Sequence, residues 1–277
     1  MKIAMFGTTL YAGVISSLLA ESGHQVFICN DLQDHTALFN LRDQDVVRSL
    51  EKQHKSGFLS YCDFAALPLD IDAYFFSFNP AQEGEALGVA KQLKMRTIIH
   101  PKLMINASTF GLNGTEKLKA VLTKDHWVYF PDIIQEGQAF KSVTSASKVI
   151  IGCADQQAQG HLEEMLRPIF PRPQQYLFMP VLDAEFTKLS ISGMLATRIS
   201  YMNDLADVAE KLGIDIAHVR DGMAADSRIG ESYLYSGAGF GGENFSHDIL
   251  TLSNTISNTG TKSQLLGQVW DINEQQK

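Results

Sequence analysis

The chain has 277 residues, 45% hydrophobic and 19% charged, and is therefore long enough for two hydrophobic cores. Its formal net charge is -8 and no basic block occurs, which argues against nucleic acid or anionic membranes as partners. No long apolar segment precedes the first strand, so we expect a cytoplasmic protein. Cys29, Cys62 and Cys153 show no metal-binding or CxxC spacing, which predicts small buried side chains and no metal site.

The chain opens with a predicted strand at 2–6, a glycine turn, an apolar helix to about Ser22 and a second strand at 25–29. In this βαβ order, the glycine turn takes the place where a dinucleotide-binding fold holds a pyrophosphate on a helix N-terminus. The turn supplies these candidate cofactor contacts: Gly7, Thr8, Thr9, Leu10, Tyr11 and Gly13.

The turn departs from the GxGxxG pattern of such folds. Two threonines follow Gly7, and Gly13 comes one place late. Because the middle glycine normally lets the backbone approach the pyrophosphate, side chains here are expected to crowd the cofactor or reshape the loop. Asn30 stands where an acid normally binds the adenine ribose, and Asp31 follows it. NAD and NADP both remain open, as does a turn that binds no dinucleotide.

Residues 32–69 are mostly polar and predict helix, with Gly57 as a break. A buried strand at 73–78 then ends at Asn79 and Pro80, where a parallel sheet presents its ligand edge. After an intervening helix, another strand delivers Thr109, whose hydroxyl either contacts a reacting group or caps a helix.

Asp132 and Glu136 follow a further strand, four residues apart. Paired carboxylates on a turn are typical of a solvated surface, and the residues alone favour that interpretation. A strand, a helix at 156–166, a proline-rich segment and a final strand follow, and the prolines cannot lie inside a helix. We therefore expect a dinucleotide-binding domain at 1–175, with the boundary between about Arg172 and Asp183.

A long helical pattern opens the second predicted domain, 183–277, with Asp183 as N-cap and Gly213 as C-cap. Apolar residues recur on one face at spacings of three and four: Phe186, Leu189, Leu195, Ile199, Met202, Leu205 and Val208. Its ~30 residues span about 45 Å, which is typical of a helix that crosses between domains or lies buried in a dimer.

Four glycines lie within six positions behind this helix: Gly237, Gly239, Gly241 and Gly242. Such a run brings backbone amides close to a ligand, and a flexible surface loop is the alternative. Phe240 within the run, and a helix whose start Ser246 is expected to cap, favour a binding loop.

Several segments resemble, in order and spacing, the central helix and active-site loop of the UDP-glucose/GDP-mannose dehydrogenase family: AEFTKLSISGMLATRISYMND, DSRIG and GAGFGGENFSHD. Other segments resemble further signatures of that family: STFGLNGT, PDIIQEGQA, KVIIG and WDINEQQK. The resemblance covers essentially the whole chain. It implies an α/β fold, with an N-terminal Rossmann-type doubly wound sheet followed by an all-α domain with a long central helix.

The family oxidises the primary alcohol of a nucleotide sugar to a carboxylate, passing two hydrides in turn to NAD. The second half of that reaction needs a cysteine thiolate as nucleophile, and the resemblance places Asn244 in the position of this cysteine. An amide is no nucleophile. The resemblance therefore implies at most a two-electron alcohol/carbonyl interconversion, with NAD or NADP as cofactor.

For the first half of the reaction, the resemblance implies that Lys188 is the acid/base, that Asp248 holds water and orients this lysine, and that Ser192 replaces a family asparagine. It assigns supporting catalytic roles to Thr109 and Glu136. It also places Asn79 and Pro80 beside the nicotinamide ribose and implies these substrate contacts: Asp132, Arg228, Phe240, Gly241 and Gly242.

In the family, the arginine that Arg228 matches reaches into the partner's substrate pocket, which implies a homodimer built on the long helix. The residues alone favour a surface ion pair with Asp226 or Glu231. The family also has a further nucleotide-binding domain, which we expect this chain to lack.

Two main interpretations remain open. The chain is either an NAD(P)-dependent oxidoreductase acting on CH-OH groups of a nucleotide sugar or related small molecule, or a non-catalytic dimeric ligand-binding or regulatory protein, a pseudoenzyme. A β-hydroxyacid dehydrogenase is a third interpretation, because such enzymes share the Rossmann domain, the helical domain and a catalytic lysine. The GFGG loop favours the nucleotide-sugar relatives over it.

Overall fold

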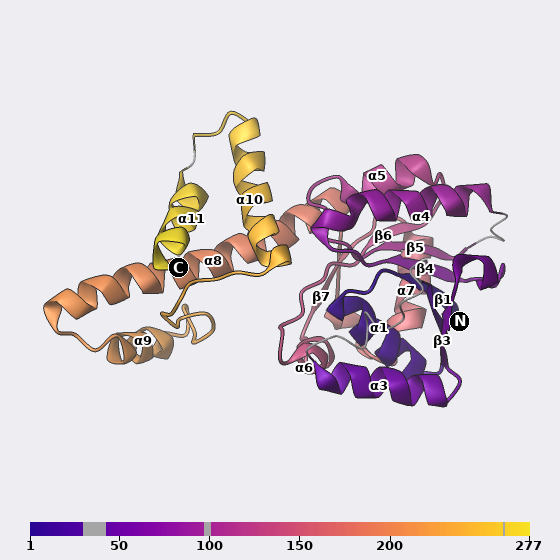
Figure 1. The fold of residues 1–277 in the computed structure, drawn as a ribbon, viewed down its shortest axis with the longest axis horizontal. Coiled ribbons are helices and arrows are strands. Elements are labelled where there is room, and N and C mark those ends of the chain that lie inside the picture. The colour runs from indigo at the N-terminus through magenta and orange to yellow at the C-terminus, as the bar shows by residue number, and fades with distance from the viewer. Residues whose placement is uncertain (30–42, 97–100, 263) are drawn as a thin grey trace. The chain divides into compact units, whose positions relative to one another are not determined.

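The computed structural model describes residues 1–29, 43–96, 101–262 and 264–277 (Figure 1). Within them the chain forms two compact units, residues 1–186 and 187–277. Helix α8 (Val181–Leu212) begins in the first unit and continues in the second. The domain limits expected from the sequence, 1–175 and 183–277, remain a prediction.

An eight-stranded sheet forms the centre of the first unit, in the order β3-β2-β1-β4-β5-β6-β7-β8. Neighbouring strands run parallel except β6 and β7, which pair antiparallel. The strands are β1 (Lys2–Phe6), β2 (Gln25–Cys29), β3 (Leu59–Cys62), β4 (Ala73–Phe76), β5 (Leu103–Asn106), β6 (Trp127–Tyr129), β7 (Val149–Gly152) and β8 (Tyr176–Met179). This is the doubly wound α/β sheet that the sequence predicts.

Helices cover both faces of the sheet, and the strand sequences show why. Successive side chains of a strand point to opposite faces, so Ile3 and Met5 of β1 enter one core while Ala4 and Phe6 enter the other. The first core contains residues of α1 (Leu10–Glu21), α3 (Gln44–Lys55), α6 (Ala139–Thr144) and α7 (Gln156–Leu166). The second contains residues of α4 (Glu83–Met95) and α5 (Gly114–Val121), which Figure 1 shows together on one side of the sheet.

The strand order reverses beside β1, whose two neighbours are β2 and β4. In an open parallel sheet, ligands bind outside the carboxyl ends of the strands at such a reversal. The loops that leave β1, β4, β5 and β6 carry five of the ten residues expected from the sequence to bind a cofactor: Gly7, Thr8, Thr9, Asn79 and Pro80. We call these loops the carboxyl-edge loops; they comprise residues 7–9, 77–80, 107–109 and 130–132.

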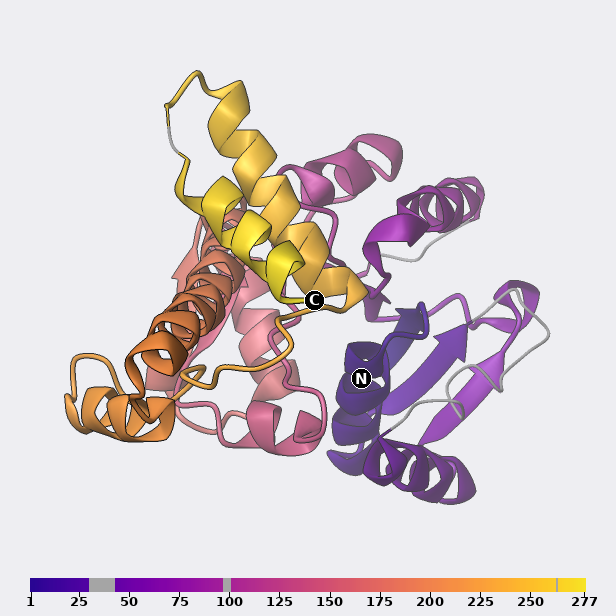
Figure 2. The ribbon, with the colours of Figure 1, turned by 60° about the vertical axis from the view of Figure 1, so that its left-hand side comes forward.

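The second unit is helical and contains most of α8 together with α9 (Ile216–Ala225), α10 (Glu243–Asn258) and α11 (Leu265–Gln276). Its core joins Ala196 of α8 to Phe240, Ile249 of α10 and Val269 of α11. Figure 2 shows α10 and α11 running side by side. None of the helices described is both long enough and apolar enough to cross a membrane.

Helix was predicted too far along residues 32–69. Residues 30–42 lie outside the described residues, α3 follows as expected, and β3 then pairs with β2 instead of continuing as helix. Gly57, at φ +80°, separates the two elements. A strand of only four residues, LSYC, alternates too briefly to be told from the end of a helix.

Two helix starts differ from the prediction. Helix α8 begins at Val181, directly after Pro180, so Asp183 lies in its first turn, where a carboxylate still interacts favourably with the helix dipole. Helix α10 begins at Glu243 with Gly242 as its N-cap at φ +88°, so Ser246 does not cap it. The positive φ of Gly242 lets the chain turn into the helix earlier than the serine suggests.

Candidate functional site

The turn between β1 and α1 is shaped by Gly7, which has φ +95°. A Cβ on this residue would lie 1.9 Å from the carbonyl oxygen of Ser77, so only glycine fits between β1 and β4. Gly13, the second glycine of the motif, lies inside α1, where its amide donates to the carbonyl of Thr9. The loop therefore keeps one conformationally essential glycine.

Thr9 takes part in holding this loop. Its hydroxyl accepts a hydrogen bond from the amide of Ala12 at 3.0 Å and so caps α1. The same hydroxyl lies 2.6 Å from that of Ser77 on the neighbouring loop. Thr9 is buried and Thr8 half-buried, so Thr8 is the more accessible of the two hydroxyls.

Tyr11, in the first turn of α1, interacts with the loop that follows β6. Burial raises the pKa of Tyr11 well above its usual value, and the negative charge of Asp132 raises it further. Asp132 accepts a hydrogen bond from the amide of Ile134 at 3.1 Å. The structure thus brings an expected cofactor residue and an expected substrate residue near each other within the first unit.

The loops after β4 and β5 are joined by Ser108. Its hydroxyl donates to the carbonyl of Phe76 at 3.0 Å and accepts from the amide of Phe78 at 3.1 Å. Thr109 is buried beside it. Asn79 caps the short helix η2 (Pro80–Gln82), so both residues expected beside the nicotinamide ribose lie at the carboxyl edge.

The roles expected of three other residues in the first unit remain predictions. Asn30 and Asp31 lie outside the described residues, so the ribose prediction stays a prediction. Glu136 is exposed, on the turn that precedes α6. A catalytic role for this carboxylate likewise remains a prediction.

In the helical unit, Lys188, Ser192 and Asp248 come together. The ammonium group of Lys188 donates to Oδ2 of Asp248, and the hydroxyl of Ser192 donates to the same oxygen at 2.7 Å. The lysine side chain is 9% exposed and the aspartate 1%. Lys188 and Ser192 are four apart on α8 and so share a helix face, while Asp248 comes from α10.

This cluster retains capacity for further hydrogen bonds. Within the described part of the chain, Oδ1 of Asp248 and Oδ1 of Asn244 are buried and have no hydrogen-bond partner. Both residues lie on one helix, α10, one turn apart. Buried polar atoms in folded proteins are almost always paired, so two orphaned oxygens here are typical of a site that binds a water or a ligand.

The glycine-rich loop is fixed by two asparagines. Asn203 accepts from the amide of Gly237 at 2.8 Å, and Asn273 both accepts from the amide of Phe240 at 2.6 Å and donates to its carbonyl at 3.1 Å. The Phe240 ring is buried, edge-on to Phe245 at 5.3 Å. Phe240 therefore anchors the loop through the core.

The remaining substrate candidates of this unit are solvent-facing. Gly241 and Gly242 are exposed, and a Cβ on either would meet no atom of the described residues within 4 Å. The side chain of Arg228 is 88% exposed and pairs with Asp226 at 2.7 Å. This is the surface ion pair that the residues alone favour.

Sequence reasoning did not single out Asn203 or Asn273, which hold the glycine-rich loop, although both lie within segments that carry the family resemblance. Asn203 and Asn273 are buried amides on helices, and a buried asparagine has no periodic signature. Glu185 was missed as well: it accepts from the amides of Asn113 at 2.7 Å and Thr115 at 2.9 Å, at the N-terminus of α5. An acid one residue from the predicted start of a long helix, three residues before Lys188, could have drawn attention.

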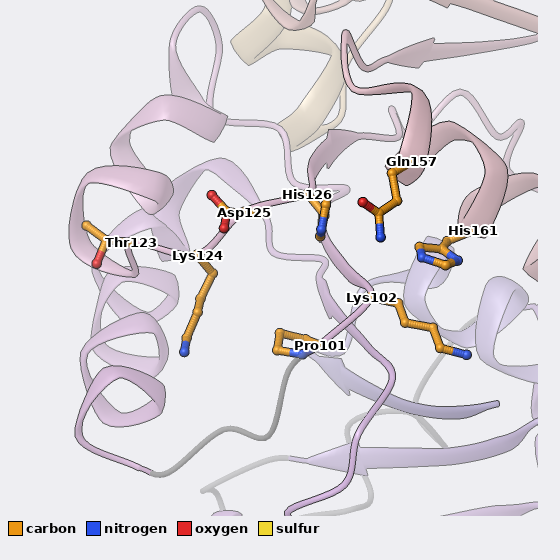
Figure 3. A pocket seen from close by; sticks show the side chains of 8 residues that line it. All are labelled: Pro101, Lys102, Thr123, Lys124, Asp125, His126, Gln157 and His161. Atoms are coloured by element: carbon orange, nitrogen blue, oxygen red, sulfur yellow. The ribbon is translucent and has the colours of Figure 1, made fainter.

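A cavity of about 460 Å³ lies near the amino ends of β5 and β6, away from the carboxyl-edge loops. Figure 3 shows the side chains that line it. Its lining includes Lys102, His126 and His161. Lys102 pairs with Asp72 at 3.5 Å, and His126 pairs with Asp155, whose pKa this hydrogen bond lowers. Because neighbouring carboxylates already balance the cations, we assign no anion site here.

The fold joins a Rossmann-type sheet to a helical second unit, in which the Lys–Asp cluster is formed by α8 and by α10, the helix that follows the glycine-rich loop in the chain. Residues 182–275 match the model of the UDP-glucose/GDP-mannose dehydrogenase family, central domain. In its central-domain segment the chain is therefore similar to the UDP-glucose/GDP-mannose dehydrogenase family.

Curated relatives agree with this family. The chain is 28% identical to a UDP-glucose 6-dehydrogenase of Pseudomonas aeruginosa, over 100% of this chain and 66% of the relative. It is also 28% identical to UDP-glucose 6-dehydrogenase TuaD of Bacillus subtilis, covering 100% of this chain and 63% of that protein. The chain therefore spans about two thirds of the length of these relatives.

Solved structures support the fold. A UDP-glucose dehydrogenase from the archaeon Pyrobaculum islandicum superposes with a TM-score of 0.87 at 21% identity, over 99% of this chain and 68% of the other. At this identity the likeness establishes the fold alone, which has the Rossmann-type sheet and the helical domain expected from the sequence.

Proposed function

We propose that this chain is an NAD(P)-dependent oxidoreductase that acts on the CH-OH group of a nucleotide sugar or a related small molecule. One observation carries the proposal: Lys188 is buried against Asp248, beside Ser192. A lysine without a function is normally solvated, because burying an ammonium group is costly unless it is paired.

The arrangement suits proton transfer at an alcohol. Lys188 carries three N–H donors, and Asp248 occupies one, so others remain for the substrate oxygen. In its neutral form the lysine accepts the alcohol proton, and in its charged form it stabilises the oxygen. Asp248 fixes the orientation of the amine, and its second oxygen is available to hold a water.

The turn before α1 supports a dinucleotide. Gly7 keeps the tight turn, the first turn of α1 contains no acid, and the amides of Leu10 and Tyr11 lie at the helix N-terminus, where a pyrophosphate binds. The half-buried Thr8, next to Gly7, supplies a hydroxyl donor at this turn. A dinucleotide held at this turn would supply the hydride acceptor for oxidation of the carbinol carbon.

Asn244 limits the proposed chemistry to two electrons. Oxidation of an aldehyde through a thioester requires a thiolate, and an amide cannot take that role. Cys29, Cys62 and Cys153 all belong to the sheet unit, on β2, β3 and the residue after β7. The proposed product is therefore a carbonyl compound.

We further propose a homodimer built on α8. Met194, Tyr201 and Val208 are each at least 49% exposed and lie seven residues apart, which is the spacing of a helix–helix seam. The opposite face of α8 buries Leu189, Ala196 and Met202 inside its own unit. A second copy of the chain would cover the exposed row.

The decisive experiment titrates the chain with NAD and NADP by calorimetry, and then assays turnover of UDP-glucose and other nucleotide sugars. We expect binding of one dinucleotide and turnover that Lys188→Met abolishes. Lys211→Met, which changes an exposed lysine on the same helix, is the matched control. No binding of either dinucleotide at millimolar concentration would refute the oxidoreductase.

The second candidate is a non-catalytic, dimeric ligand-binding or regulatory protein of the same fold. The engagement of Thr9 favours it, because this hydroxyl already caps α1 and bonds to Ser77, where a glycine would leave room for a phosphate. This candidate predicts that a nucleotide sugar binds without turnover. Turnover that depends on Lys188 would exclude it.

A further inference from the structure

Two cysteines end adjacent strands of the sheet. Cys29 is the last residue of β2 and Cys62 the last residue of β3, and the two are direct register partners in the parallel pair. Register partners face the same side of a sheet, and both cysteines belong to the core that packs against α4 and α5. Neighbouring strands lie about 4.8 Å apart, inside the Cα separation of about 4.4–6.8 Å that a disulfide needs.

We propose that Cys29 and Cys62 form an oxidative modification site, in which hydrogen peroxide converts the two thiols into a disulfide that reductants reopen. Both are thiols in this structure. The site does not involve Lys188 or its neighbours, and it goes beyond the proposed oxidoreductase activity.

The two thiols differ in a way that suits this chemistry. Cys62 is half-buried, so a small oxidant can reach it, whereas Cys29 is only 4% exposed. A hydrogen bond from Cys29 lowers the pKa of Cys62, and the nearby Arg96 guanidinium lowers it further, against the opposing effects of burial and Asp63. Cys62 is therefore the attacking thiolate and Cys29 the resolving thiol.

Arg96 is held in place by the loop that follows Cys62. Its guanidinium donates to the carbonyls of Phe64 and Leu67 and lies 5.5 Å from the centroid of the Phe64 ring. These contacts hold the guanidinium in place, so that its positive charge stays near the Cys62 thiolate and stabilises it. Cys153 has the contrary setting, because burial raises its pKa.

The reaction balances in two steps. The Cys62 thiolate attacks one oxygen of hydrogen peroxide; an S–O bond forms, the O–O bond breaks, and the released hydroxide takes up a proton to become water, leaving a sulfenic acid. Cys29 then attacks the Cys62 sulfur; an S–S bond forms, the S–O bond breaks, and hydroxide leaves with the Cys29 proton as a second water. Two thiols are oxidised and one peroxide is reduced.

The test treats the full chain with hydrogen peroxide, denatures it, tags the remaining thiols with a maleimide and maps the peptides by mass spectrometry. We expect two of the three thiols to disappear into a Cys29–Cys62 peptide and to return with dithiothreitol. Cys153→Ser is the matched control and should form the same bond. Three intact thiols after treatment, or a cross-link that includes Cys153 or a second chain, would overturn the proposal.

Variants separate the two roles. Cys29→Ser should stop at the sulfenic acid on Cys62, which dimedone traps, while Cys62→Ser should give no trapped product. Arg96→Gln should slow oxidation of Cys62 by about threefold to tenfold, and Arg96→Lys should restore most of the rate, because the charge and not the shape is needed. Equal rates in Arg96→Gln and the unchanged chain would contradict the assigned attacking thiol. If a variant does not fold, peptide mapping of the unchanged chain still decides the pairing.

Discussion

The carboxyl-edge loops of the sheet and the Lys188 cluster of the helical unit differ in how completely their polar groups are hydrogen-bonded. In the loops, hydroxyls and amides bond to one another: Thr9 to Ser77, and Ser108 to the backbone of Phe76 and Phe78. In the cluster, Lys188 and Ser192 both converge on one oxygen of Asp248, while its other oxygen has no partner among the residues described.

The difference shows in which region the polar groups are already hydrogen-bonded within the protein. The loops need no ligand to satisfy their hydrogen bonds, so a dinucleotide would have to compete with, or add to, bonds already formed. The cluster holds buried charge whose bonding is incomplete, which is costly unless something else binds there. A chain that keeps the Lys188 cluster but cannot bind a dinucleotide at the β1–α1 turn would bind a ligand without turnover. The predictions below test whether the chain behaves in this way or as an oxidoreductase.

Asp248→Asn gives the largest expected effect. Removing one partner of a buried ion pair leaves an uncompensated charge on Lys188, which costs about 3–5 kcal/mol of unfolding free energy. The double variant Lys188→Met/Asp248→Asn should recover much of this loss, because no charge then remains buried. Chemical denaturation of the four proteins measures the coupling. Additive losses would mean that the pair is not held as the structure shows.

Asn273→Ala tests whether the glycine loop is held from outside. Its amide makes two hydrogen bonds to the backbone of Phe240, so we expect a loss of about 2 kcal/mol. Limited proteolysis should also cut the loop at 237–242 faster. Asn254→Ala, on an exposed part of α10, is the control and should leave both measurements unchanged. A loop with unaltered proteolysis would show that Phe240 packing alone holds it.

Thr9→Ala tests whether the hydrogen bonds of the loop between β1 and α1 compete with a dinucleotide. It removes the cap of α1 and the bond to Ser77, and the expected loss is about 1 kcal/mol. If Thr9 competes with a phosphate, dinucleotide affinity should rise in calorimetry despite the lower stability. If affinity falls, the hydroxyl is a cofactor contact. Ser77→Ala separates the two bonds, because it spares the cap.

Glu185→Gln gives the smallest expected effect, a change in how the free energy of unfolding depends on pH. Burial raises its pKa above the ordinary 4.5, although the amides of Thr115 and Asn113 act in the opposite direction. The folded chain therefore binds this proton more tightly than the unfolded chain, so the contribution is fully present below pH 4.5 and is lost as the pH rises through the raised pKa. Glu185→Gln should flatten this part of the stability profile. Parallel profiles for both proteins, measured by denaturation between about pH 4 and 7, would count against a raised pKa.

The sequence predicted most of the sheet and its helices. Apolar strands flanked by turn residues were found for β1, β2, β4 and β7, and α7 was bounded without error, because buried parallel strands and amphipathic helices have distinct periods. The four-residue edge strand β3 escaped because its residues, LSYC, alternate too briefly to be told from the end of a helix. Helices α8 and α10 begin earlier in the chain than predicted, because Pro180 and Gly242 precede the expected caps Asp183 and Ser246 and already allow the helix to start.

The sequence by itself determined the fold class, the Lys188 and Asp248 candidates and the long helix, since each depends on local periodicity or on an ordered motif. Only the tertiary structure decided that these two residues, 60 positions apart, form a buried pair with Ser192. It also decided that Asn273 fixes the glycine loop and that Cys29 and Cys62 are register partners. Hydrogen bonds and strand register between distant segments depend on how the chain packs, and no local pattern of residues encodes them.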